Sequence, residues 1–133
     1  MQVIIGGAYN GKGNYVRTLL QHEEVYYFDG ELPTRTFPAH AYVVICHFEK
    51  LLAPLEALGE VEAATTIFEQ LDRLNNEVQV ICVCTDMSRG IVPLDATARF
   101  IRDASGRLYQ RLFEKSSKVT RIWYGLAEIL KED

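Results

Sequence analysis

The residues with the clearest potential for chemistry form a glycine-rich loop directly after the first apolar run of the chain. Gly6, Gly11 and Lys12 have the spacing of the phosphate-binding pattern G-x-x-x-x-G-K. Glycines let a loop curl so that its N–H groups point at an anion, and a following helix adds the positive end of its dipole. Lys12 would add a full charge for the terminal phosphates, and we expect it to be the catalytic residue. The expected nucleotide-binding residues are Gly6, Gly7, Ala8, Tyr9, Asn10, Gly11, Lys12, Gly13 and Asn14.

The positions that would supply ligands to a magnesium ion do not match this pattern. The pattern ends in Ser or Thr, whose hydroxyl binds Mg²⁺, whereas this chain has Gly13. The second anchor is an acid at the end of a neighbouring strand, where Ile45 and Cys46 stand here. Glu49 follows within a few residues and could substitute. We therefore expect phosphate binding with weakened phosphoryl transfer; Mg²⁺ is a possible cofactor whose ligands are degraded, and no residue is assigned to it.

Short apolar runs alternate with segments of helical spacing along the chain. Strands are expected at 2–5, 24–28, 41–46, 77–85 and 118–125, and helices at 13–22, 48–76 and 94–115. The helix over 48–76 should be interrupted near Pro54 or Gly59, and residues 126–133 are expected to be a tail. This alternation predicts a single α/β domain over residues 1–133, with a mainly parallel sheet.

The composition is that of an ordinary globular protein. The 133 residues are 48% hydrophobic and 24% charged, and the net charge of −4 gives no electrostatic reason to expect nucleic acid as a partner. No apolar run has the roughly 18 residues of a membrane span, and the N-terminus lacks the charged region of a signal peptide. Three cysteines, Cys46, Cys82 and Cys84, argue for free thiols and a cytoplasmic protein. We expect Cys82 and Cys84 to pack in the core.

Several further polar residues have an ordinary structural explanation beside a functional one. His40 and His47 could act as nucleophiles, but the sequence shows no partner that would fix a tautomer. Arg107 and Arg111 share one face of the long helix. They could be solvated or contact a neighbouring subunit, or one of them could reach a phosphate. Asp103 is placed to pair with Arg107.

Three aromatic residues lie in the loop or near the end of the last expected strand. Tyr9 could stack on a base or simply cap a pocket. Trp123 and Tyr124, at the end of that strand, are expected to be packing residues.

The second half of the chain carries a longer motif, in which "TDMSRGIVP" at 85–93 leads into "ARFIRDASGRLYQRL" at 98–112. Together with the loop, it resembles the bifunctional adenosylcobinamide kinase/adenosylcobinamide-phosphate guanylyltransferase family. In that family a strand ending in T/S-N-E leads to G-I-V-P and a helix R-x-F-R-D-x-x-G-R-x-N-Q-R-L. Thr85 and Asp86 fall on the first two positions of the T/S-N-E triplet. The further matching residues are Gly90, Ile91, Val92, Pro93, Arg99, Arg102, Asp103, Gly106, Arg107, Gln110, Arg111, Leu112 and Gly125.

The resemblance implies a three-layer P-loop nucleotide-binding fold and a homotrimer. It also implies GTP or ATP as the phosphate donor for the hydroxyl of adenosylcobinamide, and then transfer of GMP through a histidine–GMP intermediate. In the family the guanylylated histidine lies on a helix that would fall between residues 29 and 41, where this chain is shorter. Met87 also replaces the glutamate of the triplet.

We therefore expect a nucleotide-binding protein of this family in which the kinase step is more plausible than the guanylyltransferase step. Its expected partners are a nucleotide, adenosylcobinamide and further copies of the chain, with no nucleic acid and no membrane. The alternative is a non-catalytic paralogue that binds a nucleotide or phosphate as a regulatory or interaction module.

Overall fold

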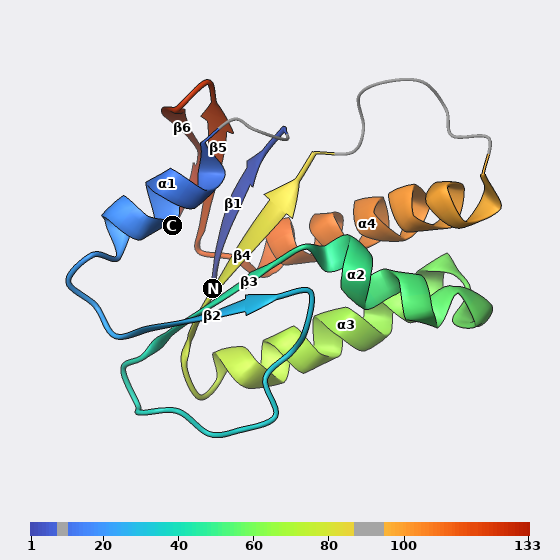
Figure 1. Cartoon of the computed structure of the whole chain (residues 1–133), viewed down its shortest axis with the longest axis horizontal. Coiled ribbons are helices and arrows are strands. Elements are labelled where there is room, and N and C mark those ends of the chain that lie inside the picture. Colours follow the sequence, from blue (N-terminus) through green and yellow to red (C-terminus); the bar gives the residue numbers. More distant parts are fainter. Residues whose placement is uncertain (8–10, 87–94) are drawn as a thin grey trace.

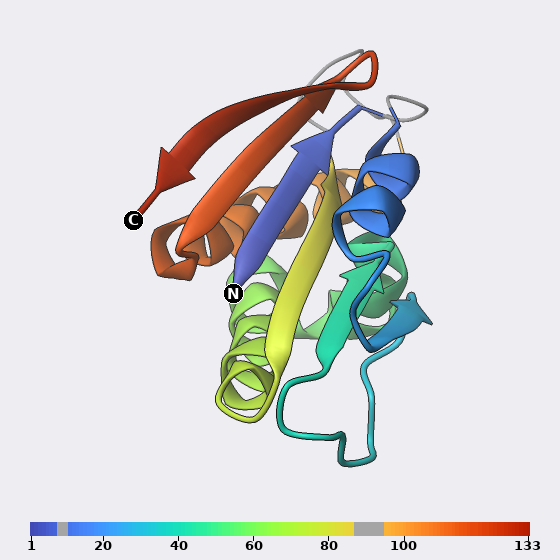
Figure 2. The same cartoon turned by 90° about the vertical axis from the view of Figure 1, so that its left-hand side faces the viewer.

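A mostly parallel β-sheet forms the centre of the protein (Figures 1 and 2). The structure is a computed structural model that describes residues 1–7, 11–86 and 95–133. Its strands are β1 (Gln2–Gly6), β2 (Val25–Asp29), β3 (Tyr42–Cys46), β4 (Gln79–Thr85), β5 (Lys118–Trp123) and β6 (Leu126–Glu132). The order across the sheet is β2-β3-β4-β1-β5-β6, and the paired strands run parallel except β6, which is antiparallel to β5.

Helices cover both faces of this sheet, as Figure 2 shows. They are α1 (Lys12–Leu19), α2 (Phe48–Leu52), the 3₁₀ helix η1 (Ala53–Leu58), α3 (Glu60–Asn75) and α4 (Ala96–Lys115). One apolar cluster joins Val16 of α1 to Ile4 of β1, whereas the larger cluster joins α3 and α4 to the opposite face of the strands. The expectation of an α/β domain with a mainly parallel sheet is therefore confirmed. Within the described residues, no helix combines the length and the apolar character that a membrane crossing requires.

The central strands are apolar without interruption because both of their faces are buried. Successive residues of β1, such as Val3 and Ile4, point into the two different clusters. Cys82 and Cys84 of β4 are fully buried free thiols in the larger cluster, as expected.

The region between β3 and β4 also follows the expectation from the sequence. The helical stretch breaks at η1, which has Pro54 in its first turn, and Gly59 then adopts a φ of 84° before α3 begins. This positive-φ conformation is open to glycine at little cost. The segment 30–41, between β2 and β3, contains no helix; it packs through Phe37, whose ring centroid lies 4.9 Å from that of Tyr26.

The C-terminal residues contradict the expectation of a tail. Residues 126–132 form β6, which pairs with β5 through a two-residue turn at Tyr124 and Gly125. Tyr124 and Gly125 have positive φ values of 50° and 78°, as two-residue hairpin turns of type I′ require. Such turns usually carry Asn or Asp before the glycine. Because this chain has Tyr124 there, the sequence did not predict the turn. Trp123 and Tyr124 were expected to be packing residues; their rings contact each other, but they are 38% and 78% exposed, so neither is buried.

Candidate functional site

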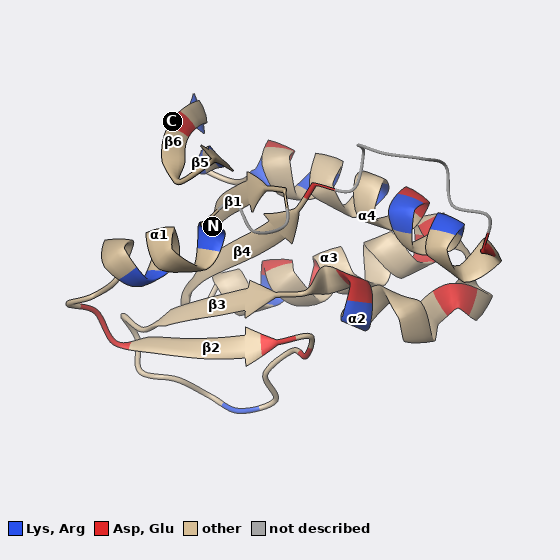
Figure 3. Cartoon of the chain, turned by 45° about the horizontal axis from the view of Figure 1, so that its top comes forward, with Lys and Arg blue, Asp and Glu red and all other residues tan. Residues whose placement is uncertain are grey.

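The carboxyl ends of β1, β3 and β4 meet the start of α1 at one edge of the sheet. The chain leaves β1 through α1 toward β2 at one side, whereas α4 leads from β4 across β1 to β5. Ligands of open α/β sheets bind at such a reversal of strand order. Figure 3 shows that acidic residues gather at the ends of β2 and β4 and on α2, around this edge.

Lys12 begins α1 and turns back toward the strand that precedes the loop. Its Nζ donates hydrogen bonds to the backbone oxygens of Gly7 (2.7 Å) and Gly6 (3.2 Å). Partial burial lowers the pKa of Lys12 below its usual value, while the charge of Glu49 opposes this shift. The loop carbonyls thus hold a cation that is partly stripped of water at the end of β1.

Close approaches explain two of the glycines. A Cβ on Gly6 would lie 2.6 Å from the carbonyl oxygen of Ile122, so no side chain fits there. Gly11 caps α1 with a φ of 88°, and a Cβ there would lie 3.4 Å from the Cα of Gly125. The turn of the β5–β6 hairpin therefore packs directly against the end of the loop.

Gly13 has neither constraint. It lies exposed in the first turn of α1, and the nearest atom to an added Cβ would be a guanidinium nitrogen of Arg17, at 3.3 Å. A serine side chain would fit at this position, so the backbone does not exclude the hydroxyl that the phosphate-binding pattern has there. Asn14 is likewise exposed in α1. The other expected loop residues, Ala8, Tyr9 and Asn10, lie outside the described residues.

The end of β3 offers no acid of its own, but one follows closely. Ile45 is fully buried in the core, as its side chain requires. Glu49, in the first turn of α2, raises the pKa values of both Lys12 and Cys46 through its charge. Glu49 follows the end of β3 closely in the chain, so its carboxylate is an acid that could support a cation at this edge.

Thr85 and Asp86 lie beside the loop. The N–H of Asp86 donates to the carbonyl oxygen of Gly6 (2.8 Å), which extends the pairing of β4 with β1 to the start of the loop. The carbonyl oxygen of Thr85 accepts a hydrogen bond from the hydroxyl of Tyr109 (3.1 Å), and burial raises the pKa of that phenol. Asp86 is therefore fixed by its backbone next to Gly6.

His47 has a partner that the sequence did not reveal. Its Nδ1 lies 2.5 Å from a carboxylate oxygen of Asp29 and 3.5 Å from the Cys46 sulfur, and Lys50 donates to the same Asp29 oxygen. The hydrogen bond from His47, followed by that from Lys50, lowers the pKa of Asp29. The pairing of β2 with β3 sets Asp29 opposite Cys46, and this register creates the cluster.

The cluster of Asp29, Cys46 and His47 also has donor types that divalent metals use. One donor atom of each residue lies within 4.8 Å of the others, and the set of carboxylate, thiolate and imidazole suits Zn²⁺. Lys50 competes for Asp29, and burial raises the pKa of the Cys46 thiol, so both effects oppose metal binding.

The remaining candidates lie away from the loop. His40 is exposed just before β3, at the amino edge of the sheet, opposite the edge that carries Lys12. Arg107 pairs with Glu60, and Arg111 donates to the Thr65 hydroxyl of α3 (3.1 Å). The expected pair of Asp103 with Arg107 is not formed, since Asp103 pairs with the neighbouring Arg102.

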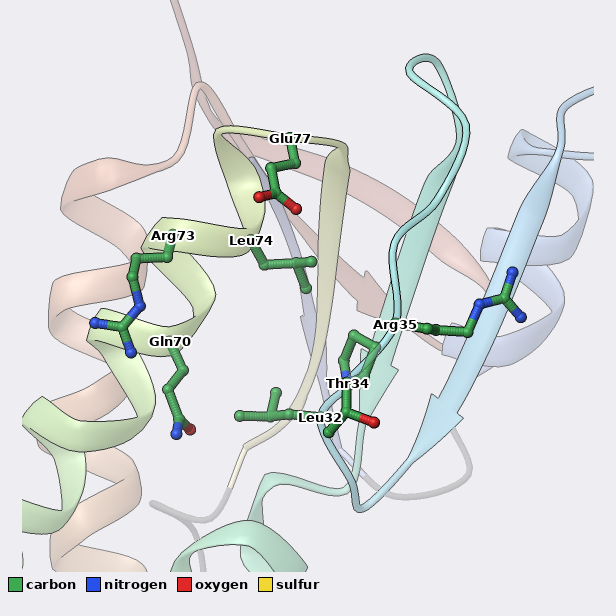
Figure 4. Close-up of a pocket in the computed structure, with 8 residues that line it drawn as sticks. Leu32, Thr34, Arg35, Gln70, Arg73, Leu74 and Glu77 are labelled. Carbon is green, nitrogen blue, oxygen red and sulfur yellow. The ribbon is translucent and has the colours of Figure 1, made fainter.

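Two of the pockets in the described part of the chain lie near the candidate residues of the sequence or the segment between β2 and β3. The first, of about 510 Å³, lies beside the loop; its lining includes Gly6, Gly7, Asp86, Arg121, Trp123 and Tyr124. The second, of about 420 Å³, lies between segment 30–41 and the end of α3 (Figure 4). There Arg35 extends toward β2, where its guanidinium lies 4.7 Å from the ring centroid of Tyr26. Only the first of these two pockets adjoins the candidate loop.

No family model and no curated protein sequence matches this chain. The family suggested by the motifs therefore rests on the residues of the chain alone.

Proposed function

We propose that the chain is a nucleotide-binding protein whose loop from Gly6 to Gly13 holds the phosphates of GTP or ATP in a P-loop. The observation that carries this proposal is the position of Lys12, whose Nζ lies over the carbonyls of Gly6 and Gly7 at the start of a helix. A bound phosphate would give the ammonium group an anionic partner, and the N–H groups of the first turn of α1 would add to its binding.

The resemblance to the adenosylcobinamide kinase/guanylyltransferase family supports the kinase as the activity. A kinase needs the loop, Lys12 and some support for a cation, for which Glu49 is the nearest acid after β3. The guanylyltransferase needs a nucleophilic histidine near the phosphates. Segment 30–41 has no helix to carry one, and His40 lies at the opposite edge of the sheet. Phosphorylation of adenosylcobinamide is thus the activity to assay, and a GMP phosphoramidate on the purified protein would contradict the preference.

A non-catalytic binding module is the second candidate, and Gly13 favours it. The backbone at Gly13 has room for a serine, yet this position carries no hydroxyl that could bind Mg²⁺. Such a module would bind a nucleotide without Mg²⁺ and release it unchanged.

Thermal unfolding with GTP, ATP and GDP, each with and without Mg²⁺, tests the binding. A ligand at about 100 times its dissociation constant adds roughly 2.7 kcal/mol, which is on the order of 10 °C for a domain of this size. We expect such a shift in the wild type and its loss in Lys12→Ala. Lys115→Ala is the matched control, because Lys115 is an exposed lysine at the far end of α4 that pairs with Asp72. Equal shifts in both variants, or no shift in the wild type, would contradict the proposal.

The role of Glu49 separates the two candidates. If the kinase assignment is correct, the shift should be larger with Mg²⁺, and Glu49→Gln should remove only that additional part. A shift that is the same with and without Mg²⁺, together with no phosphoryl transfer, would favour the binding module.

A further inference from the structure

The β5–β6 hairpin stands beside the candidate loop and has no role in the function proposed so far. Its turn contacts the loop, because Gly125 lies against Gly11 at the cap of α1. Both views show the hairpin tip at the same edge of the sheet as the start of α1 (Figures 1 and 2). A nucleotide whose phosphates lay in the loop would therefore have the hairpin as its immediate neighbour.

The two sides of β1 differ in what they offer to the rest of a nucleotide. Toward β3 lies an acid, Glu49, in the helix that follows this strand. Toward β5 lies the pocket of about 510 Å³, which runs from Gly6 and Gly7 to Trp123 and Tyr124. Its size falls in the range of small-ligand sites. An aromatic base suits the second side better than the first.

The aromatic residues of the hairpin are exposed in the way that a stacking platform requires. Trp123 is 38% exposed and Tyr124 is 78% exposed, and their rings meet edge to face with centroids 5.7 Å apart. The guanidinium of Arg121 lies 4.4 Å from the Trp123 ring centroid. A cation over a ring helps to fix the orientation of that ring.

We propose that the hairpin binds the base of the nucleotide, which stacks on Trp123 in the pocket beside Gly6 and Gly7. This inference rests on the proposed nucleotide binding and adds the place of the base to it. Bases stack on aromatic side chains whatever their identity, since every base has a π-face, so the platform fits a purine nucleotide without choosing between guanine and adenine.

Trp123 is the only tryptophan of the chain, so the protein's tryptophan fluorescence reports on the surroundings of this one ring. We expect GTP and ATP to quench the emission on binding. Inorganic triphosphate has no base, so we expect it to bind the loop, as seen by thermal shift, without quenching. Trp123→Ala should weaken nucleotide binding roughly 5- to 150-fold, the range of one base–aromatic stack, and leave triphosphate binding unchanged.

Two controls separate stacking from folding. Trp123→Phe keeps an aromatic face and should retain most of the affinity. Tyr27→Ala removes another exposed aromatic ring, 54% exposed on the edge strand β2, and should change neither ligand. If Trp123→Ala binds nucleotides as the wild type does, the base lies elsewhere and the inference is wrong, while nucleotide binding itself stands. If the wild type binds neither triphosphate nor nucleotides, the proposed function and this inference both fail.

Discussion

At the scale of single residues, Lys12 hydrogen-bonds to the loop that is proposed to bind the phosphates. Its ammonium group bonds to two loop carbonyls, and partial burial lowers its pKa. A phosphate that enters the loop must compete with those carbonyls, but it brings a full negative charge, which makes the stronger hydrogen bond. Under the proposed function, Lys12 would therefore exchange these carbonyl partners for the phosphate.

Gly13 gives the first prediction at this scale. In Gly13→Ser, the new hydroxyl stands where the phosphate-loop pattern has its Mg²⁺ ligand, and we expect the thermal shift with GTP or ATP to rise when Mg²⁺ is added. The substitution should also stabilise α1 by a few tenths of a kcal/mol, because serine has a higher helix propensity than glycine. Thermal unfolding with and without Mg²⁺ measures both effects.

Gly13→Ala is the matched control for this substitution. It raises helix propensity without adding a hydroxyl, so it should stabilise the protein and leave the effect of Mg²⁺ unchanged. If both variants respond to Mg²⁺ in the same way, the hydroxyl does not reach the metal.

The Asp29–His47 pair gives a prediction on pH. Because its partners lower the pKa of Asp29 below 3.8 in the folded protein, the unfolded state binds more protons in the acid range. The contribution of Asp29 to stability is therefore complete above pH 3.8 and is lost as the pH falls through the lowered pKa. Urea unfolding from about pH 6 to about pH 3 should show a smaller loss of stability in Asp29→Asn than in the wild type. Parallel curves for the two proteins would contradict this assignment.

At the scale of elements, the sequence predicts most of the sheet because five strands have apolar runs of ordinary length. It does not predict β6, because the exposed strand shows no buried face and its turn has Tyr124 where Asn or Asp is usual. The Asp29–His47 contact is also beyond reach of the sequence. It depends on the register of β2 against β3, which joins residues 18 positions apart.

Two glycines test the backbone strain in the hairpin turn, because they differ in φ but have the same open space around them. An added Cβ meets nothing within 4 Å at either Gly125 or Gly106, but Gly125 has a φ of 78° and Gly106 lies in α4. We expect Gly125→Ala to destabilise the protein by about 1 kcal/mol and Gly106→Ala to stabilise it by about 0.5–1 kcal/mol. Urea unfolding measures both changes. The same sign for the two variants would exclude backbone strain at the turn.

At the scale of the whole molecule, one outer strand of the sheet leaves large apolar side chains exposed. The outer strand β6 exposes Leu126, Ile129 and Leu130, which are 73%, 53% and 49% exposed. Monomeric proteins seldom leave several large apolar side chains together on an edge strand, because such an edge can pair with another chain. The homotrimer implied by the family resemblance would give this strand a partner.

Sedimentation equilibrium tests this expectation. A trimer would have about three times the chain mass of 15.1 kDa. We expect Ile129→Lys to lower the mass toward that of the monomer, because a charge at a buried interface is costly unless it is paired. Val61→Lys is the control, since Val61 is 55% exposed on α3, on a helix away from β6. A wild type that stays monomeric at all concentrations would contradict the trimer, whereas a trimer that survives Ile129→Lys and not Val61→Lys would move the interface from the sheet edge to α3.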